Sequence, residues 1–343
     1  MEANLLVSVI IPVFNVRPYL SEALDSVIKQ SYSNLEILII DDGSTDGSGE
    51  ICEEYSEDPR VQVIHQENKG LSAARNVGLD MMTGDIVAFL DPDDKYHTDF
   101  IRLMMEGMVR EEADIIICKY SYHESTGRII TTGKEKTSPP AGQGLYDKYQ
   151  SLSYLADGII NLSVWNKLYR NELWKEIRFP EGHVYEDIFT TYKVFNCCSS
   201  VFVLDFHLYC KRLHDSSITR NCTLERIHDR LLARQKVDEF IAANIPDIFT
   251  QEQLEKRSQD QLKILIIFYI LLPERSSEDI RNKEELKEKI LEAGKCGKIH
   301  KQKNGIKVAY YLVIYCPWLL RIAYPVYHQI RIILRKVIGA FGK

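Results

Sequence analysis

An apolar run that ends in three carboxylates constrains this chain more than any other feature. Residues 86–90 read Ile-Val-Ala-Phe-Leu and are followed by Asp91, Pro92, Asp93 and Asp94. Because no polar side chain interrupts the run, it predicts a strand that is buried on both faces. Proline cannot continue a central strand, so Pro92 ends it. The carboxylates would then lie at the carboxyl end of a strand, where ligands bind in open α/β sheets.

Two interpretations of this acidic stretch remain open from its residues alone. Three carboxylates within four residues repel each other, and a hard divalent cation such as Mg²⁺ or Mn²⁺, which takes oxygen ligands, would keep them ionised. Alternatively, the carboxylates begin a helix, where the helix dipole favours negative charge. The rest of the chain must decide between a metal site and a helix start.

Strand-like and helix-like stretches alternate from the beginning of the chain. Continuous apolar runs predict buried strands, and the stretches between them carry apolar residues at helical spacing. This alternation favours an α/β fold with a mostly parallel sheet flanked by helices. Residues 152–170 also look helical. The predicted strands are residues 5–14, 35–40, 61–65, 86–90, 114–118 and 201–209.

The second predicted strand also ends in carboxylates, Asp41 and Asp42, and a Gly-Ser-Thr turn follows them. Glycines stand at positions 43, 47 and 49, but they do not form the G-x-G-x-x-G pattern of dinucleotide-binding folds. The chain also lacks the G-x-x-x-x-G-K-[ST] pattern of P-loop proteins. Both of these nucleotide-binding classes are therefore disfavoured.

Charge is distributed unevenly along the chain. The formal net charge is −6, yet residues 293–343 contain 10 Lys or Arg and no Asp or Glu. The uncharged run at 308–320 has 13 residues, fewer than the about 20 that a membrane-spanning helix needs. The mixture of aromatic and basic residues in the tail as a whole predicts an amphipathic helix on an anionic membrane surface. Docking on the protein's own body or on a second subunit is the alternative, and nucleic acid is disfavoured because the body is acidic.

Three parts are expected: an α/β domain at residues 1–220, a helical domain at 221–300 and the basic aromatic tail at 301–343. The eight cysteines show no C-x-x-C spacing, and no secretory signal precedes the first strand. These two observations predict free thiols in a reducing cytosol. The tail is expected to bind the inner face of the cell membrane. A zinc site is disfavoured because adjacent cysteines are poor ligands; its candidates are Cys197, Cys198, His207 and Cys210.

Four ordered stretches resemble the inverting family-2 glycosyltransferases with a GT-A fold, which is Rossmann-like. They are VSVIIPVFN, EILIIDDGSTDGS, NKGLSAARNVGL and GDIVAFLDPDD. The pair Glu186 and Asp187 resembles the catalytic acidic motif of that family, and the resemblance covers roughly residues 5–220. It implies transfer of a sugar from a nucleoside diphosphate sugar to an acceptor hydroxyl, and we expect the donor to be a UDP-sugar. A glycan or lipid-linked intermediate of bacterial surface polysaccharide would suit as acceptor.

The resemblance assigns the donor's nucleoside to the ends of the first two strands. A buried carboxylate that accepts an N–H of a uracil-type base discriminates strongly, because a base without that donor leaves the carboxylate unpaired. Alternatively, these carboxylates only terminate a strand and cap a helix. The nucleotide-contact candidates are Pro12, Val13, Phe14, Asn15, Asp41 and Asp42.

The resemblance places the diphosphate and its divalent metal, Mn²⁺ or Mg²⁺, at the acidic strand end. Asp93 would hold the metal, and Asp91 would face the ribose or a metal-bound water, with Asp94 as a further candidate. The metal would neutralise charge on the leaving group. Further candidates are Lys69, Arg75 and Arg212 as diphosphate contacts, His214 as a metal ligand and Trp165 as a stacking partner of a sugar. For each of them, a role at the surface or in the core is the alternative.

The resemblance makes Asp187 the general base and gives Glu186 an orienting or acceptor-binding role. A single base that activates a hydroxyl opposite the leaving group implies inversion at the anomeric carbon. Acidic residues that merely begin a helix are the alternative.

Two rival functions stay open. A sugar nucleotidyltransferase would want a Gly-rich, Arg-bearing loop after the first strand, and residues 12–15 contain neither residue type. A catalytically silent module that binds a glycan or a partner is the rival from another class. A homo-oligomer is compatible with every one of these functions.

Overall fold

The computed structural model describes residues 5–124, 129–130, 143–213, 224–245, 262, 265–266, 269–270, 277–293, 304–315 and 317. The chain divides into two compact units. Residues 1–218 and 232–248 form the first, and residues 219–231 and 249–343 form the second. The expected three-part division at 220 and 300 stays a prediction.

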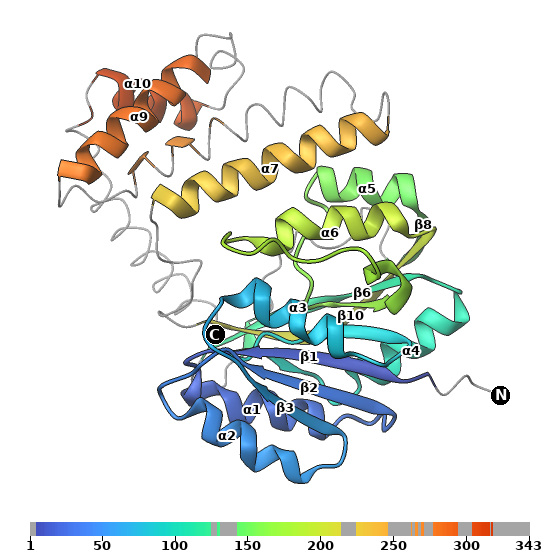
Figure 1. Ribbon diagram of the computed structural model, residues 1–343. Helices are drawn as coiled ribbons and strands as arrows, with labels where there is room; N and C mark the ends of the chain where they lie inside the picture. Colours follow the sequence, from blue (N-terminus) through green and yellow to red (C-terminus); the bar gives the residue numbers. More distant parts are fainter. Residues whose placement is uncertain are drawn as a thin grey trace, which may run out of the picture. The chain divides into compact units, whose positions relative to one another are not determined.

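The first unit is built on one sheet whose strands follow the order β3-β2-β1-β4-β9-β6-β10-β5. The first four strands of this order pair in parallel, as the alternation of strands and helices predicts. Their carboxyl ends therefore lie at one edge of the sheet (Figure 1). They are β1 (Val7–Val13), β2 (Leu35–Asp41), β3 (Val61–His65) and β4 (Ile86–Phe89).

The other half of the sheet is mixed. Strand β9 runs antiparallel to both of its neighbours, β4 and β6, whereas β6 and β10 are parallel. The α/β fold class is thus confirmed, with a mixed sheet flanked by helices. These strands are β5 (Lys95–Tyr96), β6 (Ile115–Glu124), β7 (Ile129–Ile130), β8 (Gly144–Asp147), β9 (Lys167–Arg170) and β10 (Ser200–Leu213).

The helix expected over residues 152–170 is wrong in its second half. Helix α5 (Lys148–Ala156) ends early, and residues 167–170 form β9. Leu168 and Tyr169 are both fully buried. Two apolar residues are too few to show whether the period is that of a helix or of a strand, and here the pairing of β9 with β4 and β6 decides.

Helices cover both faces of the sheet. Helices α1 and α2 lie on one side of β1, β2 and β3, and α3 and α6 lie on the other (Figure 1). Helix α3 packs so closely that a Cβ at Gly78 would overlap Ile10 of β1. The helices are α1 (Arg17–Ile28), α2 (Ser48–Glu54), α3 (Leu71–Met81), α4 (Phe100–Arg110) and α6 (Glu186–Cys197), with 3₁₀ turns η1 (Tyr55–Glu57) and η2 (Asn171–Trp174).

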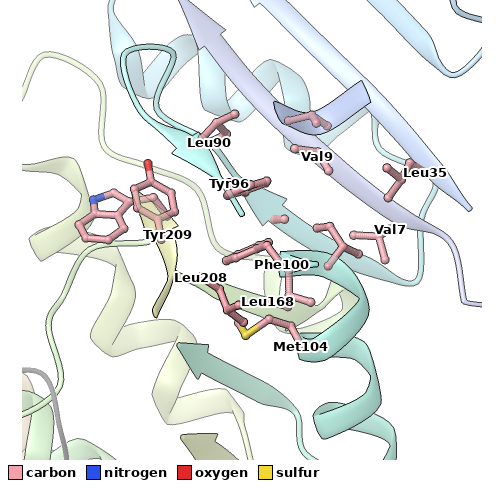
Figure 2. Packing of buried hydrophobic residues seen from close by; sticks show 14 of the residues in the cluster. Val7, Val9, Leu35, Leu90, Tyr96, Phe100, Met104, Leu168, Leu208 and Tyr209 are labelled. Carbon is pink, nitrogen blue, oxygen red and sulfur yellow. The ribbon is translucent and has the colours of Figure 1, made fainter. Parts of the chain in front are cut away.

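The main core lies beneath one face of the sheet. Alternate residues of β1, Val7 and Val9 among them, point to this face and meet Phe100 and Met104 of α4 and Tyr96 of β5 (Figure 2). All of these side chains are buried. The apolar run of β4 is buried throughout, so the carboxylates that follow it lie at the end of a fully buried strand.

Helix α7 (Leu224–Asn244) follows the sheet in the chain. The second unit contains α9 (Ser277–Ala293) and α10 (Asn304–Tyr315). Leu286 and Ile290 of α9 and Tyr310 and Val313 of α10 belong to one small apolar cluster. Among the residues that the structure describes, no helix is both long and apolar enough to cross a membrane.

Candidate active site

Three groups of acidic residues border the carboxyl edge of the parallel strands. Asp41 ends β2 and Asp42 follows it, Asp91 follows the end of β4, and Glu186 begins α6. The sequence places the first two groups at strand ends, and the structure agrees. Each group has its own set of hydrogen-bond partners, and these partners determine what the group can do.

Asp42 is bonded by the loop that leads into α3. Its carboxylate accepts hydrogen bonds from the backbone N–H of Lys69 at 2.9 Å, the N–H of Gly70 at 2.8 Å and the Gln66 side chain at 2.6 Å. The residue is buried. These contacts tie the turn after β3 to the end of β2, so Asp42 fixes the rim of the site.

Asp41 faces the turn on its other side. One oxygen accepts a hydrogen bond from the Ser44 N–H at 3.1 Å, and the other lies 2.8 Å from Nδ1 of His65, at the end of β3. Each carboxylate oxygen offers two acceptor positions. Asp41 therefore keeps acceptor capacity for a ligand N–H although it is anchored at both oxygens.

The end of β1 joins the same rim. Pro12 and Val13 are buried in the strand, whereas Phe14 is 44% exposed. Asn15 has a positive φ of 51°, and its side-chain oxygen accepts a hydrogen bond from the Thr45 N–H at 2.8 Å. Non-glycine residues in this left-handed region cluster at functional sites. The turn after β1 is thus bonded to the turn after β2, with the Phe14 ring toward solvent.

The stretch after β4 forms a compact carboxylate cluster. Ligand oxygens of Asp91, Asp93 and Asp94 all lie within 4.8 Å of one another. Asp94 is buried and accepts hydrogen bonds from the Tyr209 hydroxyl at 2.8 Å and the Arg212 N–H at 2.7 Å. Burial, followed by the charges of Asp93 and Asp91, raises the pKa of the Asp94 carboxyl well above its usual range.

This cluster fits a hard divalent cation. It offers carboxylate oxygens, the ligands that Mg²⁺ and Mn²⁺ prefer. Asp91 and Asp93 are only half-buried, so their oxygens are accessible, while Asp94 is bonded to β10. Asp91 and Asp93 are therefore the residues best placed to ligate an ion, and Asp94 supports them.

Arg75 of α3 links this cluster to α6. Its Nη2 donates to Asp91 Oδ1 at 2.8 Å and its Nη1 donates to Glu186 Oε1. The guanidinium is 2% exposed and stacks over the Phe179 ring at 5.3 Å. Buried arginine is stabilised by such carboxylate pairs. Residues far apart in the chain thus meet around one cation.

Asp187 lies in the first turn of α6, beside Glu186. Tyr185 before it has a positive φ of 68°, which marks a constrained entry to the helix. Burial raises the pKa of the Asp187 carboxyl to about 7, and the charge of Glu186 adds to the rise, whereas Arg75 opposes it. A general base works best when its pKa is near the operating pH.

Several predicted contact residues have partners within the protein. The Arg212 guanidinium donates to the Asp93 carbonyl at 2.9 Å and to the Glu22 carboxylate. Trp165 is buried and stacks on Tyr209, with 4.3 Å between the rings. The Lys69 side chain is exposed, and His214 lies outside the described residues.

Two lysines of the site are absent from the sequence-based candidates. Lys211 Nζ lies 4.8 Å from the centre of the Trp165 ring. Burial alone would lower its pKa, but the carboxylates of Asp94, Asp91 and Asp93 outweigh burial and raise it. Lys211 precedes Arg212 in a basic pair, which was the sequence signal.

Lys167 of β9 is the second such lysine, and it is fully buried. Its ammonium donates to the Asn161 and Asn166 side chains at 2.7 and 2.9 Å and to the Ser163 carbonyl at 2.5 Å. Burial lowers its pKa to about 7. The polar pair Asn166 and Lys167 inside an apolar stretch was the signal that the sequence offered.

Comparison with known proteins gives the same assignment as the motifs. The family model "Glycosyl transferase family 2" matches residues 8–181. The chain is 38% identical to the glycosyltransferase GlyA of Streptococcus pneumoniae over 231 residues, which cover 65% of this chain and 32% of GlyA. It is 32% identical to GlyG of the same organism over 220 residues, 63% of this chain and 73% of GlyG. The chain thus spans about a third of GlyA and most of GlyG.

Solved structures agree on the fold. The structure of S. aureus TarS 1-349 in complex with UDP-GlcNAc matches with a TM-score of 0.59 at 22% identity, covering 84% of this chain and 81% of that chain. The GT-A fold expected from the motifs is therefore confirmed. Because the family model spans just over half of the chain and GlyG is matched over most of its length, this chain belongs to glycosyl transferase family 2.

Proposed function

We propose that the protein transfers a sugar from a UDP-sugar to a hydroxyl group of a glycan or lipid-linked acceptor in surface polysaccharide synthesis, with inversion at the anomeric carbon. The observation that carries the proposal is the Arg75 bridge between Asp91 and Glu186. It holds a carboxylate cluster suited to a metal-bound diphosphate next to the helix turn that carries Asp187. The groups proposed to bind the donor and the acceptor would thus lie on either side of the buried Arg75 guanidinium.

The nucleoside of the donor is assigned to the rim formed by the ends of β1 and β2. Asp41 and Asp42 are buried there, and Phe14 offers an exposed ring. An acceptor carboxylate and an aromatic face suit a pyrimidine base. That TarS forms complexes with UDP-GlcNAc and with UDP supports a UDP-linked donor here. Pro12, Val13 and Asn15 shape this rim through the strand end.

The diphosphate is assigned to the cluster after β4, where Asp93 and Asp91 would hold Mn²⁺ or Mg²⁺. A divalent ion at these residues supplies Lewis-acid neutralisation of the leaving diphosphate. Its third ligand, His214, remains a prediction, as do diphosphate contacts by Lys69 and Arg212. The stacking of Trp165 on Tyr209 supports a core role for that ring more than a sugar contact.

The acceptor proton is assigned to Asp187. Its raised pKa, about 7, leaves a large deprotonated fraction at neutral pH together with useful basicity. Arg75 holds Glu186 in place, so the charge that tunes Asp187 is fixed. An acceptor hydroxyl that loses its proton to Asp187 attacks the anomeric carbon on the face opposite the diphosphate, and inversion follows.

Peripheral binding to an anionic membrane surface belongs to the same proposal. The last 51 residues carry basic groups without acidic ones, and Val308, Tyr311 and Tyr315 are exposed on α10. Sedimentation of the full chain with phosphatidylglycerol vesicles, but not phosphatidylcholine vesicles, is expected. If the chain stays in the supernatant with both, docking on protein or self-association explains the tail, and light scattering separates these two.

A donor screen tests the catalytic proposal. UDP-, GDP- and CDP-sugars are added with Mn²⁺, and both the unfolding temperature and the release of nucleoside diphosphate are recorded, since a ligand of the native state raises apparent stability. A UDP-sugar that stabilises the protein and is slowly hydrolysed is the expected result. Binding without any turnover would favour the silent module, and pyrophosphate release from UTP with a sugar phosphate would favour a nucleotidyltransferase.

A further inference from the structure

His65, the last residue of β3, lies between two carboxylates. Its Nδ1 is 2.8 Å from Asp41 Oδ2 and its Nε2 is 2.7 Å from Glu53 Oε1 of α2. A neutral imidazole has one N–H and can donate to one carboxylate only, whereas the protonated ring donates to both. With both carboxylates ionised, only the imidazolium form can donate to the two of them at once.

The surroundings of the ring favour that form. Hydrogen bonds first to Glu53 and then to Asp41 raise the pKa of His65, and burial opposes them. The Cys52 thiol of α2 also lies near Asp41, and burial raises its pKa to about 12, so that it stays neutral. The carboxylates that bond the imidazole, Asp41 of β2 and Glu53 of α2, are both acidic groups that favour its charged form.

The packing of α2 against this pair is a second, independent observation. A Cβ added to Gly49 would lie 2.8 Å from Asp41 Oδ2 and 3.6 Å from His65 Cε1. The first turn of α2 therefore passes directly over the carboxylate, and a side chain at Gly49 would push it away from His65. The backbone is built around one orientation of Asp41.

We propose that His65 is a positioning residue for nucleobase recognition: its imidazolium, held by Glu53, fixes the Asp41 carboxylate in the orientation that accepts the ring N–H of a uracil base. This rests on the proposed contact between Asp41 and the donor nucleotide. Uracil carries a ring N–H at N3 and cytosine does not, so a correctly oriented Asp41 favours UDP over CDP. Loss of the imidazolium leaves one ring N–H for two carboxylates, so Asp41 is held less firmly and that preference weakens.

The dissociation constants of UDP and CDP, measured by calorimetry with Mn²⁺ from pH 6 to pH 9, test this inference. Their ratio cancels the titration of the diphosphate, which both nucleotides share. In the wild type, the preference for UDP is expected to fall about tenfold as pH rises through the pKa of His65. His65→Gln, which cannot carry the charge, should show a low preference that no longer changes with pH.

Glu53→Gln gives a second, milder variant on an exposed side chain. It keeps an oxygen acceptor but removes the charge that raises the His65 pKa, so the midpoint of the UDP preference should move to lower pH. His97→Gln is the matched control, because His97 is an exposed histidine in the loop before α4. It should leave both the preference and the midpoint unchanged.

Asp41→Ala, which removes the acceptor altogether, separates failure of this inference from failure of the proposed function. If Asp41→Ala leaves the UDP preference intact, Asp41 does not contact the base and the nucleotide assignment falls. If Asp41→Ala abolishes the preference while His65→Gln and Glu53→Gln leave its size and midpoint unchanged, the role of His65 is overturned. A reduced preference in His65→Gln together with a lowered midpoint in Glu53→Gln supports it.

Discussion

The ends of β2 and β4 look alike in sequence but differ in how their carboxylates are satisfied. At β2, Asp41 and Asp42 receive hydrogen bonds from three backbone N–H groups and two side chains of the protein. At β4, three carboxylates crowd within 4.8 Å, and their mutual repulsion contributes to the raised pKa of Asp94. The end of β2 is therefore a rigid rim whose carboxylates can still accept a hydrogen bond from a ligand. The end of β4 carries an excess of negative charge that a bound cation would reduce.

Of the two strand ends, the one after β4 should show the larger effect on turnover when one of its carboxylates is removed. Asp93→Asn is expected to reduce turnover by about 100-fold or more, because a Lewis acid at the leaving group supplies several kcal/mol. The same variant should keep or slightly increase stability, since it removes repulsion. Calorimetry with and without Mn²⁺ is the check, and equal UDP affinity of the wild type in both conditions would refute a metal at β4.

The reverse pattern is expected at the β2 rim. Asp42→Ala leaves the Lys69 and Gly70 N–H groups without their acceptor, at a cost of about 1–3 kcal/mol each when they stay buried. We expect the free energy of unfolding in urea to fall by about 2–4 kcal/mol. Glu106→Ala is the control, because its exposed pair with Arg102 contributes about 0–1 kcal/mol. Equal losses in both variants would show that the rim is not specially ordered.

Asp187, the third acidic position, can be compared with the two strand ends through the pH dependence of the rate. The rate kcat/KM should rise with pH through about 7, because Asp187 must lose its proton to act as the base. Glu186→Gln removes a neighbouring negative charge that raises the pKa of Asp187, so the acidic limb should move down by about one pH unit. A limb that stays in place would mean that another group controls it.

The smallest effect is expected at Lys69. Its side chain is exposed, and its backbone N–H, which bonds Asp42, survives truncation. Lys69→Ala should therefore weaken UDP binding only about threefold, in line with a solvent-screened contact. A tenfold loss that disappears in 0.5 M salt would instead identify Lys69 as a direct partner of the diphosphate.

Both acidic strand ends could be predicted from sequence, because a buried apolar run that stops at carboxylates fixes their place in a parallel sheet. The Arg75 bridge could not, since it depends on how α3 and α6 pack, and local patterns carry no such information. The sequence predicts a helix where β9 forms, because the two apolar residues of this strand are too few to show a helical or an alternating period. The buried ammonium of Lys167 depends on the same strand, so the sequence does not predict it.

Replacement of Asp187 tests the proposed mechanism most directly. Transfer or donor hydrolysis by Asp187→Asn should drop by about 10²–10⁴-fold, the usual contribution of a general base, while UDP binds with unchanged affinity in Mn²⁺. Asp205→Asn, at an exposed carboxylate of β10, serves as the control and should keep full activity. Wild-type turnover in Asp187→Asn would contradict the mechanism, whatever the metal and the donor prove to be.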